Sequence, residues 1–249
     1  MDLQKKIWMR RIEKWNLTFQ FTRMIWNYDG WRLFMIDTLI FDFDGTLMDT
    51  NGVILRSWQH TYRTLTGHEG DEEYILRTFG EPLELSLKNA FPDVPVEKSV
   101  DIYRTWHADH FSEMISLFPG VSEMLKEAKS RGYRMGIATS RVEETLYEGL
   151  QKYDLTDLFD EIVTVEEVSS HKPDPECIFK VLEKLGSKPE NAVMVGDSRL
   201  DMMCAKNAGV KAVLVAWSLS LKGMALGDFP EAEAPDSIIR TPMELFDIL

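Results

Sequence analysis

The chain has 249 residues, 44% of them apolar, which is enough to bury one hydrophobic core and to accommodate an insertion. Its formal net charge of -13 repels phosphate backbones and anionic membranes, so neither nucleic acid nor membrane is an expected partner of the main body of the chain. Two cysteines, Cys177 and Cys204, lack metal-type spacing and are expected to be buried thiols in a reducing cytosol. No apolar run has the length of a membrane span and no signal peptide is recognisable, which predicts a cytoplasmic protein.

Residues 1–34 differ in composition from the rest of the chain. Seven basic residues against three acidic ones give this stretch a positive charge, and it holds four of the seven tryptophans. The apolar residues from Leu3 to Phe19 recur at helical spacing, which predicts a basic amphipathic helix on a membrane or a partner. The alternative hypothesis, which we favour, is that Met35 is the natural start and that the preceding residues are a translated leader. Residues 1–35 are therefore interpreted as an N-terminal extension.

Five short apolar runs in the remainder predict β-strands. They cover residues 38–42, 134–139, 161–165, 192–197 and 211–216. Helical patterns separate the last four runs. Near-continuous apolar strands that alternate with helices are typical of a parallel sheet covered on both faces. The sequence therefore predicts an α/β fold with a doubly wound, Rossmann-like parallel sheet.

The first two predicted strands are separated by a long stretch of helical periodicity without a convincing strand. Its apolar residues include Trp58, Tyr62 and Leu87. Pro119 and Gly120 return the chain to the core. The predicted domains are a helical cap at 49–118 and a core formed by 36–48 and 119–249.

Polar residues follow the predicted strands at the point where each strand ends. The groups are Asp42-Phe43-Asp44-Gly45-Thr46, Thr139-Ser140, Lys172, and Gly196-Asp197-Ser198 with Asp201. Each group alone has a simple structural explanation, such as a turn, a strand-end hydroxyl, a solvated lysine or a helix cap. Because the carboxyl ends of parallel strands meet at one edge of a sheet, their occurrence in this order favours a single site.

In these groups, and over residues 36–249, the chain resembles the haloacid dehalogenase superfamily. The resemblance implies that Asp42 attacks phosphorus as a nucleophile and that Asp44 serves as general acid and then as general base. Thr139 and Lys172 would be the other catalytic residues. The implied phosphoryl-binding residues are Asp42, Gly45, Thr46, Thr139, Ser140 and Lys172.

The same resemblance implies a Mg²⁺ cofactor. The charge of a phosphoryl group must be neutralised before a carboxylate can approach it, so cations are needed beside the nucleophile. The implied metal ligands are Asp42, the main-chain carbonyl of Asp44, and Asp197. Asp201 would orient Lys172 or a water molecule held by the metal.

Within the superfamily the chain is similar to phosphoglycolate phosphatases and related pyrophosphatases, in the stretches 79–83 and 171–175. The expected function is Mg²⁺-dependent hydrolysis of a small phosphorylated metabolite through an aspartyl-phosphate. A phosphomutase similar to β-phosphoglucomutase is the alternative, although Ile54 and Gly196 stand where that family carries a histidine and commonly a glutamate. A non-catalytic binding protein on the same scaffold is a third possibility.

Other charged residues of the predicted cap are harder to interpret. His107 and His110 lie one helical turn apart and could face one metal, but a solvated or core-edge helix is the expectation. Four cap cations could contact a substrate: Arg56, Arg63, Arg77 and Lys88. The sequence leaves the oligomeric state open.

Overall fold

The computed structural model describes residues 24–27, 30–33, 36–219 and 229–249. The chain divides into two compact units, Met1–Met35 and Ile36–Leu249. In the first unit, β1 (Met24–Asn27) and β2 (Gly30–Leu33) pair as an antiparallel hairpin. The predicted helix between Leu3 and Phe19, and the proposed start at Met35, lie outside the described residues. Among the described helices, none has the length and apolar character needed to cross a membrane.

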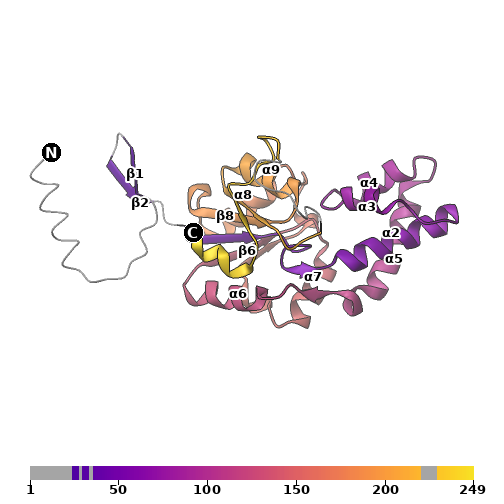
Figure 1. The fold of residues 1–249 in the computed structure, drawn as a ribbon, viewed down its shortest axis with the longest axis horizontal. Helices are drawn as coiled ribbons and strands as arrows, with labels where there is room; N and C mark the ends of the chain where they lie inside the picture. Colours follow the sequence, from indigo (N-terminus) through magenta and orange to yellow (C-terminus); the bar gives the residue numbers. More distant parts are fainter. Residues whose placement is uncertain (1–23, 28–29, 34–35, 220–228) are drawn as a thin grey trace, which may run out of the picture. The chain divides into compact units, whose positions relative to one another are not determined.

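The second unit is built on a sheet of six parallel strands (Figure 1). The strands are β3 (Thr38–Phe41), β6 (Arg134–Ala138), β7 (Glu161–Val163), β8 (Ala192–Gly196), β9 (Lys211–Val215) and β10 (Ser237–Ile239). Their order is β10-β9-β8-β3-β6-β7. All five predicted strands are present, and the predicted α/β fold is confirmed. The sixth strand, β10, was not predicted, because a run of three residues carries too little periodicity to be recognised.

Helices cover both faces of this sheet, which explains why its strands are apolar without alternation. Leu39 and Phe41 of β3 pack in one cluster with residues of α6 (Val121–Ser130) and α7 (Glu143–Lys152). Ile40, between them, packs in the other cluster with residues of α8 (Glu176–Leu185) and α9 (Arg199–Ala208). The remaining turns include the 3₁₀ helices Thr156–Leu158, Val165–Glu167, Pro189–Asn191 and Pro242–Asp247.

The two cysteines lie on α8 and α9 and are buried, as expected. The sequence did not predict that they meet, yet the Sγ atoms of Cys177 and Cys204 are 3.7 Å apart as free thiols. Their contact follows from the packing of α8 against α9.

The segment between β3 and β6 is mainly helical. Two short strands, β4 (Met48–Asp49) and β5 (Ser116–Leu117), pair antiparallel at its ends. Between them lie α2 (Asn51–Thr66), α3 (Glu72–Arg77), α4 (Leu83–Ala90) and α5 (Val96–Met114). The helices have a small apolar core of their own, formed by Trp58, Ile75, Leu87, Phe91 and Tyr103. We call residues 49–118 the helical segment; its division from the core as a separate domain remains a proposal.

Strand β3 lies in the middle of the sheet. In the strand order, β6 lies on one side of β3 and β8 on the other, so the chain crosses to opposite sides of β3. In an open parallel sheet this arrangement leaves a crevice at the carboxyl ends of the central strands. Asp42 directly follows β3 and therefore lies at this crevice.

Candidate active site

The loop after β3 is held tightly to the sheet. The main-chain nitrogen of Asp42 donates a hydrogen bond to the Val195 oxygen at 2.9 Å, and Phe43 is fully buried. Gly45 has a φ of 72°, a conformation that favours glycine. A Cβ atom at Gly45 would lie 2.1 Å from Oδ2 of Asp197, so only glycine lets Asp197 approach this loop.

Lys172 joins two of the carboxylates that the sequence places at strand ends. Its Nζ donates to Oδ1 of Asp42 at 2.8 Å and to Oδ1 of Asp201 at 2.6 Å. All three side chains are buried. Burial by itself lowers the pKa of Lys172, but Asp201 and Asp42 outweigh it and hold that pKa well above its usual value. These contacts therefore favour the charged form of Lys172 beside Asp42.

The Asp201 side chain is held by hydrogen bonds from Ser198 and packs against Gly196. Its Oδ2 accepts hydrogen bonds from the Ser198 nitrogen at 3.0 Å and from the Ser198 hydroxyl at 2.6 Å, in a capping box at the start of α9. A Cβ atom at Gly196 would lie 2.4 Å from the Asp201 Cβ. A larger residue at position 196 would therefore displace Asp201 and its contact with Lys172.

Asp42, Asp197 and Asp201 form a group of carboxylates that could hold a metal ion. One oxygen from each lies within 4.8 Å of the others, and all three residues are buried. Asp197 is positioned by the Ser218 hydroxyl, which donates to its Oδ2 at 2.6 Å. Burial raises the pKa of Asp42 well above its usual value, because Lys172 only partly offsets desolvation and the neighbouring carboxylates raise it further.

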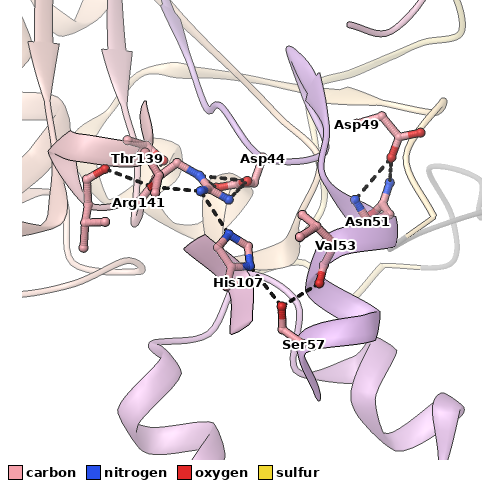
Figure 2. A network of polar contacts seen from close by, with 10 residues as sticks. Asp44, Asp49, Asn51, Val53, Ser57, His107, Thr139 and Arg141 are labelled. Atoms are coloured by element: carbon pink, nitrogen blue, oxygen red, sulfur yellow. Dashed lines mark hydrogen bonds and ion pairs between the residues drawn. The ribbon is translucent and has the colours of Figure 1, made fainter. Parts of the chain in front are cut away.

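Asp44 makes a different contact, with Arg141 in the loop after β6 (Figure 2). The Arg141 Nε lies 2.9 Å from Oδ2 of Asp44, and Nη2 lies 2.6 Å from Oδ1. The Arg141 side chain is 6% exposed and that of Asp44 is 27% exposed. Burial raises the pKa of Asp44, but the charge and hydrogen bonds of Arg141 outweigh it and lower this pKa. The pair favours the ionised form of Asp44.

The other predicted phosphoryl-binding residues differ in whether they line the cavity. Thr139 is buried and its hydroxyl accepts a hydrogen bond from the Arg141 nitrogen at 3.1 Å, while Ser140 is exposed. Both line the cavity at this end of the sheet, as Gly45 does. Thr46 is buried and does not line the cavity, and its main-chain oxygen accepts a hydrogen bond from Trp217 at 3.0 Å.

The cavity has a volume of about 690 Å³ and lies between the sheet end and the helical segment. From the helical segment it is lined by residues that include Ile54, Gly80, Glu81, Glu84 and Arg104. Gly80 also approaches the core directly, since a Cβ atom there would lie 3.0 Å from the Ser198 side chain.

The cap cations proposed from the sequence are not at this cavity. Arg63 pairs with Glu69 and Arg77 with Glu73, both on the exposed surface. Arg56 and Lys88 are exposed as well, and none of the four lines the cavity. The helical segment instead contributes Arg104, which pairs with Glu84 at 2.8 Å.

Two residues of the site were not identified from the sequence, Arg141 and His107. Arg141 lies two residues after Thr139, but a loop cation is usually solvated, so nothing in the sequence indicated a partner. His107 was expected on a solvated or core-edge helix face, and it is buried beside Arg141, with 3.3 Å between Nε2 and Nη1. His110 is half-buried and contacts the Trp106 oxygen.

Comparison with known proteins now decides the family. The family model for haloacid dehalogenase-like hydrolases matches residues 39–215. The chain belongs to the haloacid dehalogenase-like hydrolase family. The match confirms the predicted superfamily, and the chain is an enzyme of its phosphatase branch.

Curated relatives of this family member include pyrophosphatases PpaX. That of Bacillus cereus strain B4264 is 37% identical over 217 residues, covering 86% of this chain and 96% of the relative. That of Bacillus thuringiensis strain Al Hakam is 36% identical over 214 residues, with the same coverage.

Solved structures show the same fold. A structure from Bacteroides fragilis assigned to the haloacid dehalogenase-like hydrolases has a TM-score of 0.77 and 27% identity, covering 84% of this chain and 99% of that one. A structure from Thermotoga maritima assigned as a β-phosphoglucomutase has a TM-score of 0.66 and 27% identity, with 85% and 97% coverage.

Proposed function

We propose that this phosphatase is magnesium-dependent, that it hydrolyses a small phosphorylated metabolite, and that Asp42 accepts the phosphoryl group. The observation that carries the proposal is the position of Asp42 at the end of β3, with Lys172 at 2.8 Å and two further carboxylates beside it. A carboxylate can attack a phosphoryl group only where cations offset the charge of both. Asp201 also contacts Lys172 and belongs to the group with Asp197, but its two carboxylate oxygens are engaged by Lys172 and by Ser198.

The charges of this cluster fit a divalent cation. Three carboxyl groups face one ammonium, and ionising all three leaves two negative charges in excess. The donors are oxygens, which Mg²⁺ prefers. Asp42, Asp197 and the main-chain carbonyl of Asp44 would hold the ion, and Asp201 orients Lys172. When bound, the ion would neutralise charge on the phosphoryl oxygens.

In the first half-reaction, an Asp42 oxygen forms a bond to phosphorus while the bond from phosphorus to the leaving oxygen breaks. Asp44 donates a proton to that oxygen; this step needs the protonated carboxyl, whereas the Arg141 contact favours the ionised one. In the second, a water oxygen attacks phosphorus, Asp44 takes a proton from this water, and the bond to Asp42 breaks to release phosphate. Thr139 and the Ser140 amide would bind the phosphoryl oxygens, and Lys172 would offset their charge.

Pyrophosphate is the first substrate to test and phosphoglycolate the second. Relatives that are 37% and 36% identical to this chain are named pyrophosphatases. The cavity, of about 690 Å³, is enclosed on one side by the helical segment, which suits a small molecule better than a phosphoprotein.

The test is a phosphate-release screen over pyrophosphate, phosphoglycolate, sugar phosphates and nucleotides. We expect release that requires Mg²⁺ and stops when the ion is chelated. Asp42→Asn should lower kcat at least about a thousandfold, because a neutral amide is a far poorer nucleophile than a carboxylate. Asp109→Asn, an exposed residue of α5, is the matched control and should keep full activity. Release by Asp42→Asn at the wild-type rate would refute the proposal.

A phosphomutase is the second candidate, favoured by the likeness to the Thermotoga maritima structure. Two positions support hydrolysis instead. Ile54 presents an apolar side chain to the cavity, and position 196 has no room for a side chain beside Asp201. With β-glucose 1-phosphate we expect free phosphate. Conversion to glucose 6-phosphate without phosphate release would identify a mutase.

A further inference from the structure

The Arg141 guanidinium is held on every side. Nη1 donates to the Thr145 hydroxyl of α7 at 2.9 Å, while Nε and Nη2 donate to Asp44. The Cζ atom of Arg141 lies 4.4 Å from the ring centroid of Phe111, on α5. With all three nitrogens engaged and the side chain buried, Arg141 supports Asp44 at the wall of the cavity, which it also lines.

His107 continues this contact into the helical segment (Figure 2). Its Nε2 lies 3.3 Å from Nη1 of Arg141, and its Nδ1 lies 3.1 Å from the Ser57 hydroxyl on α2. An arginine can only donate, so Nε2 accepts and Nδ1 carries the proton. Nδ1 therefore donates to Ser57, whose hydroxyl donates to the Val53 oxygen at 2.7 Å. Every hydrogen bond in this chain has a defined direction.

We propose that Arg141 and His107 are positioning residues for Asp44: a directed chain of hydrogen bonds from α2 through α5 fixes the guanidinium that holds the Asp44 carboxylate. The inference rests on the proposed acid–base role of Asp44. Asp44 and Arg141 belong to the core, whereas His107 and Ser57 belong to the helical segment. The placement of that segment over the cavity is thereby coupled to the orientation of the proton-transfer group.

The test compares two substrates that differ in their need for a proton. p-Nitrophenol leaves as an anion, whereas phenol leaves readily only when an acid protonates it. kcat/KM is measured with p-nitrophenyl phosphate and phenyl phosphate, on the full chain with Mg²⁺. His107→Ala is expected to lower kcat/KM about tenfold for phenyl phosphate and less than about threefold for p-nitrophenyl phosphate. A residue that only stabilises the fold would affect both substrates alike.

Two variants control for the loss of an imidazole. His110→Ala removes a histidine one turn further along α5 and should leave the ratio of the two kcat/KM values unchanged. His107→Gln keeps a hydrogen-bond acceptor for Arg141 and should restore most of the ratio. If His107→Ala does not fold, Arg141→Lys tests the same chain of hydrogen bonds. An ammonium keeps the positive charge but loses the two-pronged contact with Asp44.

The Asp44→Asn background separates this proposal from the proposed function. There, His107→Ala should cause no further loss with either substrate, because the chain acts through Asp44. Equal losses with both substrates in the wild-type background, or a full additional loss in Asp44→Asn, would overturn the positioning role. An Asp44→Asn variant that keeps the wild-type ratio would instead refute the acid–base role of Asp44.

Discussion

His107 illustrates how one buried residue links stability to pH. Burial and the neighbouring Arg141 lower the pKa of His107 to about 3, and Asp44 only partly opposes this. The facing groups are Arg141 from the loop after β6, Asp44 from the loop after β3, and Tyr103, which stacks on the imidazole at 5.6 Å. The folded protein therefore keeps His107 neutral over a range in which an unfolded chain protonates it.

The sign of the pH effect follows from this difference. Between the unfolded pKa of about 6.5 and the folded value of about 3, the unfolded chain binds more protons, so stability falls as the pH falls. At pH 5 this costs about 2 kcal/mol relative to neutral pH. We expect urea denaturation of His107→Gln to lose about 2 kcal/mol less than the wild type between pH 7.5 and pH 5. Parallel curves for the two proteins would contradict the buried neutral imidazole.

At the scale of elements, the contact between β6 and α8 depends on a glycine. A Cβ atom at Gly136 would lie 2.5 Å from Cγ1 of Val181, which is closer than any side-chain contact allows. Both residues lie in the buried layer between the sheet and α8, and valine has little freedom to turn away. The glycine sets how closely this helix covers the sheet.

We expect Gly136→Ala to lower the free energy of unfolding by about 1–3 kcal/mol through overpacking. Adding Val181→Ala should restore part of that loss, because it removes the atom that the new Cβ meets. Gly52→Ala is the matched control: its Cβ would meet only the Met114 Cε at 3.8 Å, and its place in α2 favours alanine. Additive losses in the double variant would show that the two residues do not interact as described.

At the scale of the whole molecule, the fold and the proposed site lie within Ile36–Leu249. The central sheet, the helices on its faces and the residues of the cavity all come from this unit. The family match, residues 39–215, also falls inside it.

A chain that begins at Met35 is therefore expected to fold and to keep its activity. Its thermal midpoint and its kcat and KM in the phosphate-release assay should match those of the full chain. Loss of either folding or activity would refute the leader hypothesis for residues 1–34. Retained activity together with lost binding to anionic lipid vesicles would favour the amphipathic-helix hypothesis for the same residues.

The sequence by itself determined five of the six strands and the polar residues that follow them. Apolar runs ending in Asp42, Thr139 and Asp197 were sufficient, because each strand and the polar residue after it are local features, and parallel strands bring their carboxyl ends together. Lys172 could be included because it follows the predicted strand 161–165, which in the sequence lies between the strands that end at Thr139 and Asp197.

Only the tertiary structure decided what Asp44 contacts. Arg141 is 97 positions from Asp44, and His107 is 34 positions from Arg141 and lies on a helix of the inserted segment. No periodicity or spacing in the sequence predicts these contacts, because they depend on how α5 packs against the core. The same holds for Cys177 with Cys204 and for Gly136 with Val181. Local pattern specifies the elements, whereas contacts between distant side chains arise only from their packing.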